Sequence, residues 1–106
     1  MPTLEELFSF GAAMIKVGEL SVKQNYIEAN GFVKRKNNQY LIVINDQLSD
    51  EKKVKTLIHE LVHVYMGHNH LTPVQDETIT EHLTESIWEG GKCYERAHKF
   101  LQAEEW

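Results

Sequence analysis

Apolar residues recur at helical spacing in the first part of the chain. Between Thr3 and about Glu19 they form a single stripe, which predicts an amphipathic helix that Thr3 can cap. Residues 20–30 carry a mixed pattern that fits either a short helix or an irregular connection. This stretch ends at Asn30-Gly31, which is a turn signal.

Two stretches in the middle of the chain have the pattern of β-strands. They are Gly31–Lys36 and Gln39–Asn45, and Asn37-Asn38 between them predicts a tight hairpin turn because Asn tolerates a positive φ. The second stretch is apolar on both faces over its middle, which predicts cover on both sides. The basic run Lys34-Arg35-Lys36 is more typical of a charged edge strand than of a nucleic-acid patch.

The sequence predicts a buried helix that has Glu51 in its first turn and contains the apolar run Val54–Met66. A loop from Asp46 to Asp50 precedes it, and Ser49 or Asp50 can cap its start. Gly67 suits its C-terminal end. The helix is apolar on nearly all sides, which is typical of a helix inside a protein core.

The rest of the chain predicts a C-terminal helical region. Thr72-Pro73 is typical of a helix start, and Gly90-Gly91 can divide the region into two helices. One predicted face includes Ile79, His82, Leu83, Ser86, Ile87, Gly90, Cys93 and Ala97. Small residues along it would let the central helix approach closely.

These elements predict a single α+β domain over residues 1–106. It contains an N-terminal helix, a β-hairpin or small antiparallel sheet, a central helix and a C-terminal helical region. The net charge of -5 makes nucleic acid an unlikely partner. We expect no membrane span and no signal peptide, and Cys93 has no second cysteine to pair with, which suits the cytoplasm.

The central helix contains the sequence His59-Glu60-Leu61-Val62-His63, which matches the pattern H-E-x-x-H. Residues four apart lie on the same side of a helix, so both imidazoles can hold one metal ion. Glu60 would lie beside that ion, where it can take a proton from a metal-bound water. The alternative is a pair of ordinary core histidines held by hydrogen bonds.

A catalytic zinc site needs a third protein ligand and an open position for water. The next helical region offers six candidates, which are Asp76, Glu77, Glu81, His82, Glu85 and Glu89. One of them could bind the metal while another orients a ligand histidine. Tyr65, His68 or His70 could assist catalysis, and the pattern does not choose among them.

Three features in this order resemble the ImmA/IrrE type of zinc metallopeptidase, which is common in bacteria, prophages and other mobile elements. They are a strand ending at Asn45, a loop that carries Ser49, and the helical run Thr56-Leu57-Ile58-His59-Glu60-Leu61-Val62-His63. The resemblance covers residues 32–68, with a weaker extension to Gly90. It implies a minimal zincin-like core, although Val62 stands where the family usually has Gly.

The resemblance also ranks the candidates for the third ligand. A later helix in that family carries a Glu followed by small residues, and Glu85-Ser86 with Gly90 is similar, so Glu85 is the first choice. The segment from Glu77 to Glu81 resembles the ligand and orienting pair of thermolysin-like enzymes. Glu81 is therefore the second choice and Glu77 the third.

The sequence as a whole predicts a zinc-dependent endopeptidase of a small phage-like or mobile-element-like type. His59, His63 and Glu85 would hold Zn²⁺, and Glu60 would activate a zinc-bound water to cleave a protein substrate. The resemblance implies a transcriptional repressor as that substrate, and an exposed strand edge could hold an extended peptide. The alternatives are a non-catalytic metal-binding protein and a protein-interaction module that retains the helix.

Overall fold

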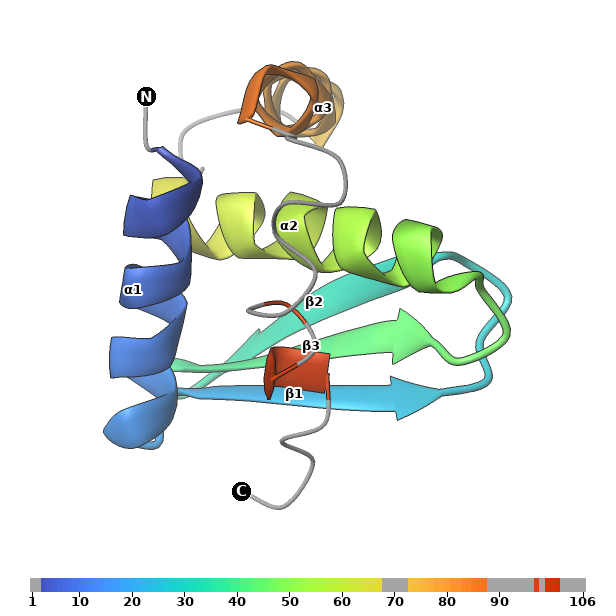
Figure 1. Cartoon of the computed structure of the whole chain (residues 1–106). Coiled ribbons are helices and arrows are strands. Elements are labelled where there is room, and N and C mark those ends of the chain that lie inside the picture. Colours follow the sequence, from blue (N-terminus) through green and yellow to red (C-terminus); the bar gives the residue numbers. More distant parts are fainter. Residues whose placement is uncertain (1–2, 68–72, 88–96, 98, 102–106) are drawn as a thin grey trace.

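The computed structural model describes residues 3–67, 73–87, 97 and 99–101. Its elements are α1 (Leu4–Lys16), β1 (Leu20–Asn25), β2 (Gly31–Lys36), β3 (Gln39–Asn45), α2 (Asp50–Met66) and α3 (Pro73–Ile87). Figure 1 shows α2 lying across one face of the sheet, α1 standing beside both, and α3 crossing over α2. The predicted α+β fold is confirmed.

The three strands form one sheet in the order β1-β3-β2. β2 and β3 form the predicted antiparallel hairpin, in which Asn37 and Asn38 have φ values of 52° and 64°. β1 runs parallel to β3, with Leu20 opposite Tyr40. The sheet is therefore mixed rather than purely antiparallel, and the stretch with no clear pattern contributes a strand.

The central strand β3 is covered differently on its two faces. Ile42 and Ile44 are fully buried on the face toward α2. On the opposite face Val43 is 5% exposed and lies between Lys23 and Phe32 of the neighbouring strands. No described helix lies on that face in Figure 1.

The ends of α1 and α2 follow the local signals. Thr3 accepts a hydrogen bond from the Glu6 amide at the start of α1, and Ser49 accepts one from Lys52 at the start of α2. α2 ends at Gly67 in the left-handed conformation. α1 ends at Lys16 rather than near Glu19, because the chain turns through Gly18 at a φ of 78° and enters β1.

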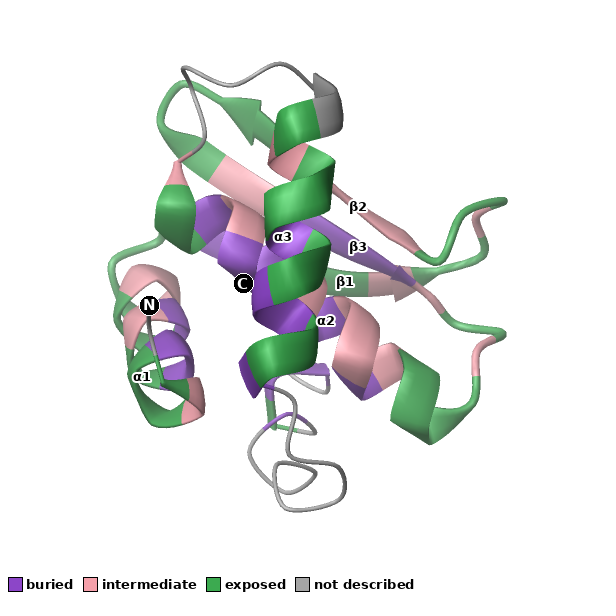
Figure 2. Cartoon of the chain, turned by 90° about the horizontal axis from the view of Figure 1, so that it is seen from above, coloured by how far each residue is buried: buried purple, intermediate pink, exposed green. Residues whose placement is uncertain are grey.

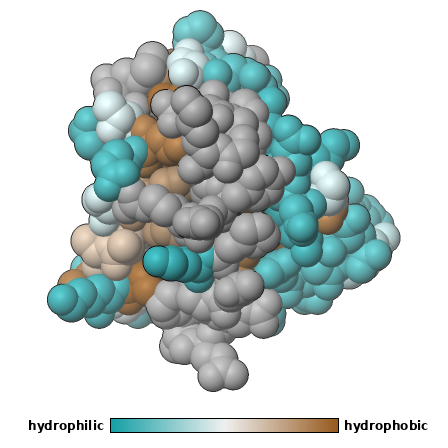
Figure 3. Space-filling model, viewed as in Figure 1, coloured by the Kyte–Doolittle hydropathy of each residue, from teal (hydrophilic) through white to brown (hydrophobic). Residues whose placement is uncertain are grey.

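One hydrophobic core joins these elements around α2 (Figure 2). Its fully buried side chains include Leu7, Phe8, Leu20, Val22, Ile42, Ile44, Leu57, Ile58 and Leu61. Phe100 joins the core, with its ring 5.4 Å from that of Phe8, and Gln24 Nε2 donates to the Leu101 carbonyl at 2.8 Å. On the side seen in Figure 1, the described surface is mainly hydrophilic toward the right and mixed hydrophobic and hydrophilic toward the left (Figure 3).

α3 packs against α2 through a face that differs from the predicted one. Its buried residues are Thr80, Leu83, Thr84 and Ile87, whereas Ile79, His82 and Ser86 are exposed. The predicted face is right for Leu83, Ile87 and Ala97, which are buried. It is wrong for Ile79, His82 and Ser86, because Thr80 and Thr84 rather than the more apolar Ile79 are buried. Gly90 and Cys93 lie outside the described residues.

No helix in the described part of the chain is long and apolar enough to cross a membrane.

Candidate metal centre

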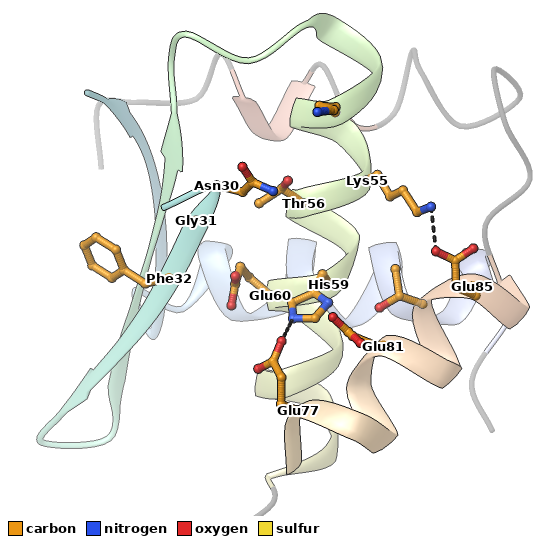
Figure 4. A pocket seen from close by; sticks show the side chains of 12 residues that line it. Asn30, Gly31, Phe32, Lys55, Thr56, His59, Glu60, Glu77, Glu81 and Glu85 are labelled. Atoms are coloured by element: carbon orange, nitrogen blue, oxygen red, sulfur yellow. Dashed lines mark ion pairs between the residues drawn. The ribbon is translucent and has the colours of Figure 1, made fainter. Parts of the chain in front are cut away.

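The central helix α2 brings His59, Glu60 and His63 together. His59 and Glu60 also line a cavity (Figure 4). Ligand atoms of these three residues lie within 4.8 Å of one another and could hold a metal ion. The His59 and His63 side chains are 19% and 12% exposed, and Glu60 is 5% exposed. A buried helix thus presents two imidazoles and one carboxylate to the same small space.

The neighbouring helix α3 adds the carboxylate of Glu77 to this group. Glu77 Oε1 lies 2.7 Å from His59 Nε2, and Glu77 Oε2 lies 3.3 Å from His63 Nε2. The two helices approach closely because Thr80 and Thr84 are small residues on the buried face of α3. The Thr84 hydroxyl donates to the Thr80 carbonyl at 2.7 Å, which satisfies that buried polar group. Glu77 lies one turn before Thr80 and therefore lies over both histidines.

The other candidate ligands have different positions. Glu85 forms an ion pair of 2.6 Å with Lys55, and its side chain is 64% exposed. Glu81 lines the cavity and its charge acts on His59, but within the described part of the chain it forms no hydrogen bond or ion pair with either histidine. Asp76 Oδ1 lies 3.2 Å from His63 Nδ1, on the side of the ring opposite Nε2. The geometry thus favours Glu77 over Glu85 as a neighbour of the two imidazoles.

The remaining sequence candidates lie away from the cluster or outside the described residues. His82 is exposed on α3. Tyr65 packs edge-on against Phe10 of α1, with ring centroids 5.0 Å apart, and it does not line the cavity. His68, His70 and Glu89 are not described. The structure thus gives no support to Tyr65 as a catalytic group.

Burial sets the protonation of the cluster. Burial lowers the pKa of His59 below 6.5, although the carboxylate of Glu77 partly opposes this, so the imidazole is neutral as a metal ligand must be. Burial, and then the negative charge of Glu77, raises the pKa of Glu60 to about 7. A carboxyl group with this pKa can both accept and release a proton near neutral pH.

A cavity of about 610 Å³ extends from the cluster along α2. Its walls come from the start of β2, the first half of α2, and α3, and the lining includes Asn30, Phe32, Lys52, Thr84 and Glu85. Gly31 lets β2 pass close to α2, because a Cβ atom there would lie 2.6 Å from Thr56 Cγ2 and 3.4 Å from Glu60 Oε2. The strand therefore runs directly beside Glu60.

β2 lies at an edge of the sheet, and no described strand pairs with its outer side. The Asn45 amide donates to the Asn30 carbonyl at 2.9 Å, so Asn30 faces β3. Because such pairs alternate along an antiparallel ladder, Gly31 and Val33 direct their N–H and C=O groups away from β3. These groups are available to an extended chain laid along the cavity.

The fold and the cluster together define a metallopeptidase-type core, in which the H-E-x-x-H helix lies against one face of a small sheet and close to the edge strand β2. The chain belongs to the Peptidase M78 family, described as the IrrE N-terminal-like domain, whose sequence profile matches residues 11–87. This range includes His59, Glu60, His63 and Glu77, and it confirms the predicted ImmA/IrrE relationship. Searches of the curated proteins and of the solved structures returned no match.

Proposed function

We propose that the protein is a zinc-dependent endopeptidase, and that His59, His63 and Glu77 hold the metal. The supporting observation is the convergence of the Glu77 carboxylate on Nε2 of both histidines, at 2.7 and 3.3 Å. Two neutral imidazole nitrogens and one carboxylate oxygen form a donor set that suits catalytic zinc. Glu77 thus replaces Glu85 as our first choice for the third ligand.

The chemistry requires a base close to the metal that is not itself a ligand, and we assign this role to Glu60. A bound zinc ion would polarise the scissile carbonyl and make a water molecule more acidic. Glu60 would take a proton from the attacking water and later give it to the leaving amine. Its pKa of about 7 in the metal-free protein shows that burial already favours proton uptake.

The substrate would bind as an extended peptide along the outer edge of β2. Gly31 and Val33 offer backbone donors and acceptors there, and the cavity beside them can receive side chains. A protein substrate agrees with the peptidase family. A transcriptional repressor as that substrate, a cytoplasmic location and a phage or mobile-element origin are further proposals that rest on the family resemblance.

The test compares zinc-loaded wild type with Glu60→Gln on a mixture of unfolded proteins, with new N-termini counted by mass spectrometry. We expect cleavage by the wild type and a loss of about 100-fold or more in Glu60→Gln, because a general base contributes about 10²–10⁴-fold. Both proteins should bind zinc equally. Glu51→Gln, the same chemical change at an exposed position on α2, is the control.

Equal cleavage by Glu60→Gln and wild type would contradict the assigned base. The non-catalytic alternative predicts two other results. The zinc-loaded wild type would cleave no protein in the mixture, and any protein from the mixture that binds the wild type would bind Glu60→Gln equally well.

A further inference from the structure

We propose that Asp76 and Thr80 are positioning residues, which fix the tautomer and ring orientation of His63 and thereby raise the affinity for the metal. This inference rests on the proposed metal site. It adds two residues of α3 that hold a ligand in place without touching the metal.

The geometry places both groups at one ring nitrogen of His63. Asp76 Oδ1 and Thr80 Oγ1 each lie 3.2 Å from His63 Nδ1. The Thr80 hydroxyl also donates to Asp76 Oδ1 at 3.4 Å, so the two α3 side chains are themselves connected. Thr80 is fully buried, and the side chains of His63 and Asp76 are 12% and 29% exposed. The arrangement is therefore shielded from competing water on most sides.

Asp76 and Thr80 provide acceptors for a proton on Nδ1 of His63, which is the tautomer that a metal ion at Nε2 requires. An ionised carboxylate only accepts hydrogen bonds, so His63 Nδ1 must donate to Asp76. A neutral imidazole with its proton on Nδ1 has its lone pair on Nε2, which is the nitrogen 3.3 Å from Glu77 Oε2. Without a metal, Nε2 can itself donate to Glu77, so the Nδ1 tautomer is required only once a metal ion occupies Nε2. Asp76 and Thr80 then raise metal affinity because the Nδ1 proton already has its acceptor and the ring does not have to rotate on binding.

The two histidines are supported differently. His59 contacts Glu77 through Nε2, and among the described residues no hydrogen bond to its Nδ1 is present. Asp76, which orients His63, directly precedes Glu77 on α3. The docking of this one helix thus supplies a proposed ligand and the support for a second ligand. We therefore expect changes in α3 to weaken metal binding, even though both histidine ligands belong to α2.

The experiment measures zinc affinity by competition with a chromogenic chelator for wild type, Asp76→Ala, Thr80→Val and Thr80→Ser. We expect Asp76→Ala and Thr80→Val to weaken binding by about 10–100-fold, which is typical when the partner of a ligand histidine is removed. Thr80→Ser keeps the hydroxyl and should restore most of the affinity. Thr78→Val, the same change at an exposed position on α3, should bind zinc as the wild type does.

Two further measurements separate positioning from packing. The visible absorption of bound Co²⁺ should change in Asp76→Ala, because the ligand field depends on ring orientation. The melting temperature in excess chelator should fall only modestly in Thr80→Val, because valine fills the same space as threonine and only the hydrogen bonds of the hydroxyl are lost.

Wild-type zinc affinity in both Asp76→Ala and Thr80→Val would overturn the inference while leaving the proposed function intact. A loss of affinity that Thr80→Ser does not restore, with a matching fall in the melting temperature of the metal-free protein, would also overturn it in favour of a packing role. A wild type that binds no zinc would instead refute the proposed function.

Discussion

At the scale of single residues, the ionised form of Glu60 destabilises the folded protein, although the proposed chemistry needs this form as a base. Its side chain is buried next to the carboxylate of Glu77, so its ionised form loses hydration and is repelled by a like charge. These two causes raise its pKa from 4.5 to about 7. A residue chosen only for stability at this position would be uncharged. The retention of a carboxyl group agrees with a role in proton transfer.

The pH dependence of the metal-free protein should reveal this conflict. Between pH 4.5 and about 7 the folded state binds more protons at Glu60 than the unfolded state does, so Glu60 makes the protein less stable as the pH rises. The shift corresponds to a loss on the order of 3 kcal/mol above pH 7. Glu60→Gln removes the titrating group and should therefore be more stable than wild type at pH 8, with little difference near pH 4.

Urea unfolding of both proteins in excess chelator, across this pH range, measures the effect. The comparison is necessary because His59 acts in the opposite direction. Its lowered pKa makes the folded state more stable as the pH rises from that lowered pKa to about 6.5, where the gain levels off. A stability difference between Glu60→Gln and wild type that does not vary with pH would show that Glu60 titrates normally.

At the scale of elements, the contact between β2 and α2 sets the distance from the strand edge to Glu60. Gly31 is the residue at which the strand passes the helix, and Thr56 is the side chain that it meets. The strand edge and the base can lie side by side only because Gly31 has no side chain. This contact connects the proposed peptide-binding edge with the proposed catalytic group.

Gly31→Ala should destabilise the protein by about 1–3 kcal/mol, as overpacking in a well-packed region does. The added methyl would lie 2.6 Å from Thr56 Cγ2, which forces the strand and helix apart. Thr56→Ser removes that methyl, so the double variant should recover about 0.5 kcal/mol or more relative to the sum of the single changes. Chemical denaturation of the four proteins measures this coupling.

Gly18→Ala provides the matched control for this cycle. A Cβ at Gly18 meets no atom within 4 Å, but the residue has a φ of 78°, so its cost is conformational. Thr56→Ser should not alter that cost. Strict additivity between Gly31→Ala and Thr56→Ser would show that the contact with Thr56 is not the origin of the strain.

The sequence predicted those elements whose signals are local. The hairpin at Asn37-Asn38 and the two ends of α2, at Ser49 and Gly67, are each determined by a few neighbouring residues. The structure confirms all three. β1 was not predicted, because its apolar pattern is short and its parallel partner β3 lies beyond a whole strand of sequence. Local patterns carry no information about such a pairing.

The same limit explains why the sequence ranked Glu85 above Glu77 as the third metal ligand. Helical spacing shows which residues of α3 share a face, but it does not show where α3 crosses α2. The crossing depends on Thr80 and Thr84, whose small size permits the close approach over His63. If Thr80 and Thr84 had been taken as the buried face of α3, the sequence would have placed the preceding turn, with Asp76 and Glu77, near the two histidines.

At the scale of the whole molecule, one core with α2 at its centre supports the candidate site. Segments outside the matched range of residues 11–87 complete that core, because Phe8 and Phe100 pack against each other and Leu101 is 2% exposed. α3 is attached through a small number of buried residues. A metal held by α2 and α3 together would link the two helices and would stabilise the folded state as it binds.

Zinc content tests the central claim most directly. Wild type, Glu77→Ala and Glu85→Ala would be loaded with zinc, passed through a desalting column and measured by elemental analysis. We predict one zinc ion per chain in wild type and in Glu85→Ala, whose exposed ion pair with Lys55 contributes little to stability. Glu77→Ala should lose the ion. Zinc retained by Glu77→Ala and lost by Glu85→Ala, or no zinc in the wild type, would contradict the account.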